Sequence, residues 1–173
     1  GFTDPIVFSN YGVILKNLGN LQKAELLQQK AIELNPNFAY AYSNLGNIFK
    51  GIGKLKEAEI YYRKAIKLKP DFADAYLNLG ATKNRLGELR EAEKFYRNAI
   101  KIKNDWAEAH RDLGNILREL GQLKKAEISY QKAIQLKPDF VEAAWNLYCI
   151  ANSIAQAEER INLCLKIDKN YLE

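Results

Sequence analysis

One interval, 34 residues, constrains the fold of this chain more than any other feature of its sequence. The pair Leu45-Gly46 recurs twice, each time 34 residues further on, and several alanines, turn glycines and aromatic residues recur at the same interval. A fixed period of this length is typical of a chain built from copies of one supersecondary unit. The period divides the chain into four registers at 5–38, 39–72, 73–106 and 107–140, and we expect residues 1–4 to be a leader or a cloning remnant.

Each register predicts two α-helices joined by a tight turn. In the second register, Leu45, Phe49 and Ile52 are spaced four and seven residues apart, which places them on one face of a helix. Gly53 follows, where a left-handed residue can end the first helix. Pro70 ends the second helix, because the residue before a proline disfavours the α conformation.

Small residues recur where the predicted helices must approach closely. We expect Gly46 and Ala58 at the crossing of the two helices of a repeat, and Ala65 where the next repeat docks. One helix pair cannot bury its apolar face alone, so neighbouring pairs must stack in sequence order. The sequence therefore predicts an all-α solenoid.

These repeats resemble the tetratricopeptide repeat (TPR) family over essentially the whole chain. The resemblance implies a right-handed α-solenoid of four full repeats, with the first helix of each repeat on an inner, concave wall. Lys83 and His110 occupy places where the second register has aromatic residues, and we expect small local losses of packing there. The residues that carry the family signature are Tyr42, Leu45-Gly46, Phe49, Ala58, Tyr62 and Pro70.

A shortened fifth repeat is predicted at 141–171. Tyr148 stands where the other registers have glycine, and Ala157-Glu158 matches the start of an earlier second helix three residues too soon. We therefore expect the deletion in a helix turn near Asn152-Ser153. Residues 172–173 would begin a further element.

The resemblance also implies a groove that binds a partner polypeptide through the first helices. Counting Ala39 as place one, place six is an asparagine in four registers and an aspartate in the other. An asparagine amide offers two donors and an acceptor, so it can pair with both polar groups of an extended peptide backbone. The alternative is that these asparagines only support the backbone between helices. The place-six residues are Asn10, Asn44, Asn78, Asp112 and Asn146, and the other predicted groove residues are Tyr40, Asn47, Arg111, Asn115 and Trp145.

This row of asparagines is similar to the ladder in the repeat arm of O-linked N-acetylglucosamine transferases. The Asn-Leu-Gly triplets at 44–46 and 78–80 carry the similarity. It implies a substrate-recruiting arm of a larger protein as one version of the groove hypothesis.

Catalytic, metal-binding and membrane-spanning functions find no support in the sequence. The single histidine, His110, occupies a packing place, and two cysteines without histidine partners cannot form a zinc site. No Gly-rich phosphate loop and no run of 18 apolar residues is present. We therefore expect no enzymatic activity, cofactor or metal. The low cysteine content fits a reducing, cytoplasmic compartment.

The leading interpretation is thus a scaffold that binds an extended peptide or a helix of a partner protein in its concave groove. A structural self-association module, stacking end to end, is the alternative, because the end of a solenoid exposes apolar surface. Nucleic-acid binding through a convex basic face ranks third. The net charge of +5 comes from 26 basic and 21 acidic residues, and the two signs are mixed along the chain.

Overall fold

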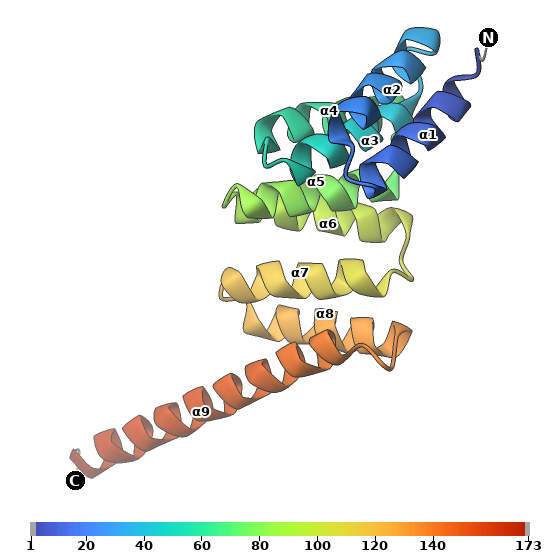
Figure 1. Cartoon of the computed structure of the whole chain (residues 1–173). Helices are drawn as coiled ribbons and strands as arrows, with labels where there is room; N and C mark the ends of the chain where they lie inside the picture. The colour runs from blue at the N-terminus through green and yellow to red at the C-terminus, as the bar shows by residue number, and fades with distance from the viewer. Residues whose placement is uncertain (1–2, 172–173) are drawn as a thin grey trace. The chain divides into compact units, whose positions relative to one another are not determined.

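The computed structural model describes the backbone of residues 3–171 and the side chains of residues 3–156, and all regular secondary structure within this part is α-helical (Figure 1). Both helices of the second register lie where the period predicts them, and the same holds for the other registers up to residue 140. The all-α class is confirmed. The helices are α1 (Pro5–Asn17), α2 (Leu21–Leu34), α3 (Ala39–Gly51), α4 (Leu55–Leu68), α5 (Ala73–Arg85), α6 (Leu89–Ile102), α7 (Ala107–Glu119), α8 (Leu123–Leu136) and α9 (Val141–Tyr171).

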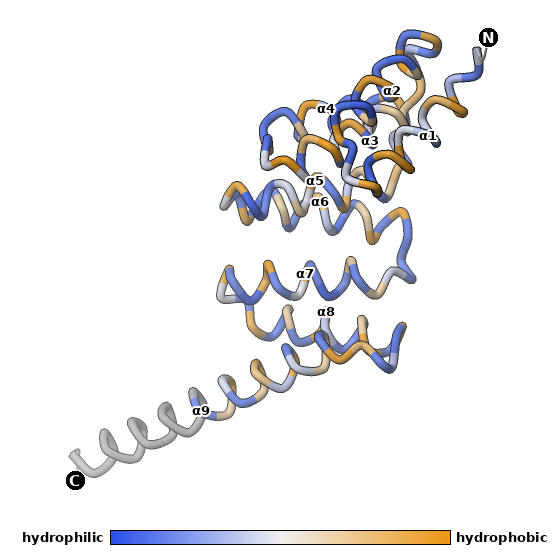
Figure 2. Tube along the Cα trace, in the orientation of Figure 1, coloured by the Kyte–Doolittle hydropathy of each residue, from blue (hydrophilic) through white to orange (hydrophobic). Residues whose placement is uncertain are grey.

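The helices form two compact units, α1–α6 and α7–α9. In the first unit the pairs α1–α2, α3–α4 and α5–α6 pack closely, and each pair docks on the next through α2–α3 and α4–α5. The first helices α1, α3 and α5 also contact one another in this order and so share one face. In the second unit α7 packs on α8, and α8 packs on α9. Figure 2 shows apolar and polar residues interspersed along the helices, as expected for amphipathic segments.

Glycines with positive φ end the first helix of each helix pair. Gly19, Gly53, Gly87 and Gly121 have φ between 74° and 81°, a conformation that side chains with a Cβ rarely adopt. At the second of these turns, the N–H of Gly53 donates to the carbonyl of Lys50 at 3.2 Å. The helix turns predicted from the glycine spacing are therefore confirmed.

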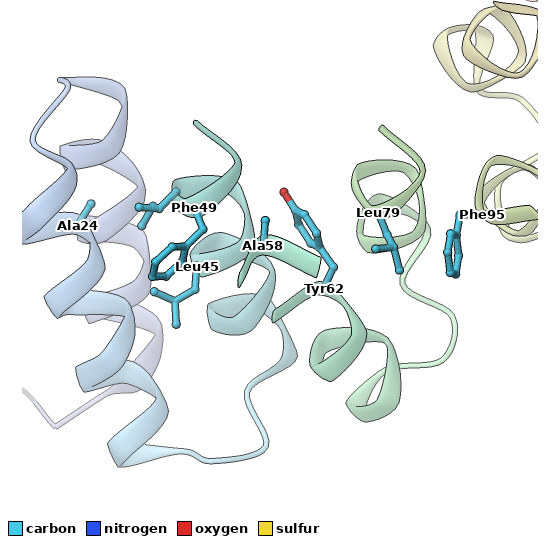
Figure 3. Packing of buried hydrophobic residues seen from close by; sticks show 8 residues of the cluster. Ala24, Leu45, Phe49, Ala58, Tyr62, Leu79 and Phe95 are labelled. Atoms are coloured by element: carbon cyan, nitrogen blue, oxygen red, sulfur yellow. The ribbon is translucent and has the colours of Figure 1, made fainter. Parts of the chain in front are cut away.

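The close approach of α3 and α4 depends on a glycine that faces Tyr62, a tyrosine of the buried cluster shown in Figure 3. Tyr62 of α4 is fully buried, and a Cβ at Gly46 would lie 2.6 Å from its ring. Ala58 and Ala65 are also fully buried, at the helix crossing and at the junction with the next repeat respectively. The expected roles of these small residues are confirmed.

The loss of packing that was predicted from a lysine at an aromatic place of the repeat is not found at Lys83. Its side chain is buried, with 4 % of the residue exposed, and Nζ lies 2.8 Å from a carboxylate oxygen of Glu59 and 2.6 Å from one of Glu88. Burial opposes the charged form, but the hydrogen bonds to the two carboxylates raise the pKa of Lys83 above its ordinary value. The prediction of a local loss of packing was wrong here, because an ion-pair cluster replaces the aromatic contact.

The leader is part of the first helix's structure. Asp4 is the N-cap of α1, and its Oδ1 accepts a hydrogen bond from the N–H of Ile6 at 2.8 Å. Pro5 follows at the first helical position, where its missing N–H costs nothing. Residues 1–2 lie outside the described part of the chain.

The predicted break near Asn152-Ser153 is wrong, because α9 continues through it as one helix (Figure 1). The sequence from Val141 to Tyr171 contains neither the turn glycine of the other repeats nor a proline. Ser153 Oγ instead donates to the carbonyl of Cys149 at 2.9 Å, one helical turn earlier. The predicted match at Ala157-Glu158 involves side chains outside the described residues, and the further element at 172–173 also lies outside them.

Tyr148 gives a second reason for the continuous helix. It occupies the place of Gly46, which has room for no side chain atom beside the tyrosine of the following helix. A full tyrosine side chain at this place would prevent a second helix from packing as it does in the other repeats. Helix α9 therefore begins where the first helix of a fifth repeat was predicted but does not turn back at the predicted point.

Candidate peptide-binding face

Five of the predicted groove residues lie on α1, α3 and α5, the helices that share one face of the first unit. We call this the first-helix face. Asn10 and Tyr40 are exposed, whereas Asn44, Asn47 and Asn78 are half-buried. The three ladder positions of the first unit, Asn10, Asn44 and Asn78, thus lie on the first-helix face.

Asn44 ties its helix to the preceding repeat. Its Nδ2 donates to Ser9 Oγ of α1 at 3.0 Å. Ser9 Oγ donates in turn to Gln28 Oε1 of α2 at 2.8 Å, and Gln28 Nε2 donates to the Ser9 carbonyl at the same distance. Ser9 and Gln28 are buried, so this network satisfies polar groups that would otherwise be costly.

Asn78 of α5 makes an equivalent contact with the preceding repeat, here with α3. Its Oδ1 accepts a hydrogen bond from Lys50 Nζ at 2.6 Å. The carbonyl of Lys50 accepts a further hydrogen bond from Arg85 Nη1 at 2.9 Å. These contacts connect α3 with α5 along the first-helix face.

Asn47 supports its own repeat. Its Oδ1 accepts a hydrogen bond from the hydroxyl of Tyr62 at 2.8 Å, and burial raises the pKa of that tyrosine well above its usual range. In the second unit, Asn115 Oδ1 accepts from the hydroxyl of Tyr130 at 2.7 Å, in the same places of the repeat. Both residues were predicted as groove residues, and their amides pack the two helices of a repeat together.

Tyr40 lies in a cluster of aromatic rings with one cation. Lys69 Nζ donates to its hydroxyl at 2.7 Å and lies 4.7 Å from the centre of its ring. The ring centre of Phe72 is 4.8 Å from that of Tyr40. The hydrogen bond raises the pKa of Lys69. With 47 % of Tyr40 exposed, this cluster holds an aromatic ring at the edge of the first-helix face.

In the second unit, Arg111 is held between two helices. Its Nη1 donates to Glu142 Oε2 of α9 at 2.8 Å, and its guanidinium lies 5.4 Å from the ring centre of Phe140. Its Nε lies 3.0 Å from Asp112 Oδ1 as an ion pair but is not aligned for a hydrogen bond. Among the described residues, this Nε is the buried side-chain polar atom without a hydrogen-bond partner.

Asn146 connects α9 with α7. Its Nδ2 donates to Asn115 Oδ1 at 3.0 Å, and its Oδ1 accepts from Arg118 Nη1 at 3.5 Å. Lys50 with Asn78 and Arg118 with Asn146 occupy the same two places of the repeat, one cation and one amide. The sequence spacing contained this pairing, although it was not recognised as an interaction.

Trp145 projects from α9 into solvent. Its exposed fraction is 64 %, so it does not cover a core of the described residues. Tyr148, one turn further along, is 58 % exposed, and the two ring centres are 5.8 Å apart. Tyr148 was missed as a surface residue, although an aromatic side chain at a glycine place was the signal that could have identified it.

No group of three or more His, Cys, Asp or Glu side chains suited to a metal ion is found in the part of the chain that the structure describes. Within the same part, no helix combines the length and the apolar character needed to cross a bilayer.

Comparison with solved structures shows the same fold in several proteins, one of which, YrrB, is described as a TPR protein. MamA is 23% identical with a TM-score of 0.79, and the match covers 91% of this chain and 86% of MamA. YrrB is 24% identical with a TM-score of 0.75, over 88% of this chain and 79% of YrrB. PilF of Pseudomonas aeruginosa is 19% identical with a TM-score of 0.82, over 88% of this chain and 69% of PilF.

Comparison with curated protein sequences gives no match. Family models of the tetratricopeptide repeat match residues 7–38, 39–72 and 71–139. These matches extend over most of the chain and agree with the helix pairs of both units. The chain therefore belongs to the tetratricopeptide repeat family, whose all-α solenoid fold generally serves as a non-catalytic module for protein interaction.

Proposed function

We propose that the first-helix face binds an extended segment of a partner protein and that the chain acts as a scaffold for it. The observation that carries this proposal is the unused hydrogen-bonding capacity of two neighbouring ladder amides. Asn44 uses one N–H and Asn78 uses its carbonyl oxygen in contacts between helices. Asn44 Oδ1 and Asn78 Nδ2 make no hydrogen bond to a described residue, and neither atom is fully buried.

A peptide backbone offers the complementary groups. An acceptor on α3 and a donor on α5 can pair with an N–H and a C=O of one extended chain. Such contacts bind the backbone and leave the partner's side chains to set specificity. Tyr40 supplies a partly exposed ring at the edge of the same face, and aromatic residues are favoured anchors at interfaces.

The second unit offers a different surface to a partner. Asn10 on the first unit is exposed at its ladder place, whereas Asn146 is already bonded through both its nitrogen and its oxygen. We assign the second unit's contribution to Trp145 and its neighbour Tyr148 rather than to its amides. Asp112, Arg111 and Asn115 would then hold the helices that present these rings.

One solved relative in fold supports a peptide ligand. YrrB is described as a TPR protein with an unusual peptide-binding site, and its fold is similar to this chain's over 88% of the length. The resemblance of the ladder to the repeat arm of O-linked N-acetylglucosamine transferases extends the proposal to a substrate-recruiting arm.

Binding of the purified chain to a diverse peptide library tests the proposal. Asn44→Ala/Asn78→Ala removes both free amide groups, and we expect its affinity for the selected peptides to fall about tenfold or more, as for two lost hydrogen bonds. Gln22→Ala/Gln135→Ala removes two exposed amides from second helices and should bind like the parent. Far-UV circular dichroism and thermal unfolding show whether the variants remain folded. Equal affinity of parent and ladder variant would exclude the amides as ligand-binding groups.

Self-association is a second candidate, and an apolar stripe on α1 favours it. Val7, Tyr11, Ile14 and Leu18 follow one another at spacings of four, three and four residues, and all are exposed. One period later, the places of the first three are filled by Ala41, Leu45 and Ile48, which are buried. The stripe is thus a docking face that α1 leaves uncovered in this structure.

Light scattering over a wide concentration range tests this candidate. If copies associate through the stripe, the mass should rise with concentration, and Tyr11→Glu/Ile14→Glu should keep the chain monomeric. A parent that stays monomeric at high concentration would rule out self-association through this face.

A further inference from the structure

A second surface of the first unit, formed by the second helices, contains a furrow that the first-helix face does not include. A cavity of about 330 Å³ lies between α4 and α6, with α5 beneath it. Its floor is apolar, because Leu79 and Phe95 are buried and Ile66 and Tyr76 are half-buried. A volume of this size is at the lower end of the range for ligand pockets and suits one or two side chains.

A second cavity of about 280 Å³ adjoins the first and shares Tyr76 and Asn98 with it. It adds Pro70, Lys101 and Ile102 to the lining. We call the two cavities together the α4–α6 furrow. The furrow has two apolar places, which fits a short stretch of peptide rather than a small compact ligand.

The rim of the furrow is cationic. Arg63 is neutralised within the protein, because it pairs with Glu59 at 2.9 Å and lies over the ring of Phe95 at 5.4 Å. Lys67, Lys94 and Lys101 are exposed, and no described carboxylate lies within ion-pair distance of any of them. The positive charge at this rim is therefore available to an anionic partner.

The preceding repeat shows that this charge is not imposed by the fold. One period earlier, between α2 and α4, the places of Lys67 and Lys94 are taken by Glu33 and Ile60, and that of Arg63 by Gln29. The place of Lys101 is taken by Lys67, so one cation recurs. The same helix packing is therefore compatible with a less cationic rim, and Lys67 and Lys94 are the rim lysines specific to the α4–α6 furrow.

We propose that the α4–α6 furrow binds an acidic segment of a protein, in which an apolar side chain enters the cavity and flanking Asp or Glu side chains meet Lys67, Lys94 and Lys101. Apolar burial supplies the anchor, and the exposed lysines supply charge complementarity and discrimination against basic segments. This site is separate from the amides of Asn44 and Asn78, so the chain would have two independent binding surfaces.

A nucleic acid fits the furrow less well than an acidic peptide. Single-stranded nucleic acids bind through exposed aromatic rings on which bases stack, in addition to cations. Here Phe95 is buried and already lies under the guanidinium of Arg63. The ring is therefore not available as a stacking platform.

Fluorescence polarisation with three labelled probes tests the proposal. The probes are an acidic peptide pool with a central Phe or Leu flanked by Asp and Glu, a matched pool with Lys at the flanking places, and oligothymidine. The variant Lys67→Glu/Lys94→Ile places at two rim positions the residues of the preceding repeat, so it should fold normally. The variant Lys23→Glu/Lys124→Ile makes the same substitutions at exposed lysines outside the furrow.

We expect the parent to bind the acidic pool in preference to both other probes, and the furrow variant to bind it about tenfold more weakly at low salt. The control variant and Asn44→Ala/Asn78→Ala should retain the parent's affinity. Absence of binding by the parent, preference for oligothymidine, or equal weakening in the furrow and control variants would overturn the proposal. Loss of binding in the ladder variant would move the ligand to the first-helix face and overturn it as well.

Discussion

Replacing Gly46 with alanine tests whether the glycine–tyrosine contact sets the distance between the helices of a repeat. A Cβ at this position would lie 2.6, 2.7 and 2.9 Å from three atoms of the Tyr62 ring. Real Cβ atoms do not approach other atoms so closely, so the ring or the helix must move. Tyr62 is fully buried and cannot move without disturbing its hydrogen bond to Asn47.

The expected cost follows from three contributions. Overpacking a core typically costs about 2 kcal/mol. Loss or distortion of the tyrosine hydrogen bond adds about 1 kcal/mol, whereas alanine in place of glycine within a helix returns about 1 kcal/mol. Gly46→Ala should therefore lower the free energy of unfolding by about 2 kcal/mol.

Two other glycines provide matched controls in urea unfolding followed by far-UV circular dichroism. Gly51, the last residue of α3, has nothing within 4 Å of a built Cβ, so Gly51→Ala should leave stability unchanged or slightly higher. At Gly80 the shortest distance to the Tyr96 ring is 3.1 Å, so Gly80→Ala should cost less than Gly46→Ala. Equal stability of the Gly46 and Gly51 variants would refute the argument that this contact sets the helix spacing.

Three further predictions concern the ion-pair cluster, a tyrosine hydrogen bond and the last helix. Burial raises the pKa of Glu59, but its hydrogen bonds to Lys83 and Arg63 outweigh burial and lower this pKa below its ordinary value of 4.5, so the carboxylate stabilises the fold fully above pH 4.5 and loses this effect as the pH falls through the lowered pKa. Lys83→Met should therefore reduce the acid sensitivity of the unfolding midpoint, and an unchanged pH profile would contradict this. Tyr62→Phe should cost about 1 kcal/mol, and a double-mutant cycle with Asn47→Ala should show that most of this cost is coupling between the two residues; additive effects would mean that the bond contributes nothing. Ser153→Pro should reduce far-UV helicity and accelerate amide exchange in α9, because proline inside a helix costs about 3 kcal/mol, whereas a chain that turned at this point would tolerate it.

The repeat period predicted most of the fold because it reports what every repeat needs. A turn glycine such as Gly53 and a crossing glycine such as Gly46 meet the same requirement in each copy, so their recurrence locates helices, turns and close contacts. The period says less about what differs between copies. Lys83 was expected to weaken packing because the register alone does not show that Glu59 of α4 and Glu88, the N-cap residue of α6, converge on it.

The end of the array shows the same limit from the other direction. Matching Ala157-Glu158 to an earlier repeat led to a predicted turn, yet Tyr148 at a glycine place already excluded the usual helix crossing. A local steric requirement was the stronger signal there, and the similarity of two residues was the weaker one. The α4–α6 furrow is a further case in which a difference between repeats is informative, because the equivalent residues between α2 and α4 lack most of its cations.

For the ladder asparagines, the sequence pattern left two hypotheses open, peptide binding and support between helices, and the two are compatible. An amide that supports a neighbouring helix with one group can still bind a ligand with the other, and Asn44 and Asn78 each use only part of their capacity within the protein. The internal bond fixes the rotamer of the amide, so less side-chain entropy is lost when a peptide binds. Asn146 already uses both its amide nitrogen and its amide oxygen in hydrogen bonds, so it has fewer free groups for a ligand, although it occupies the same place in its repeat. If the ladder binds a peptide as proposed, we expect its affinity to depend on how many amide groups each neighbouring repeat leaves free, and to be greatest on the first unit.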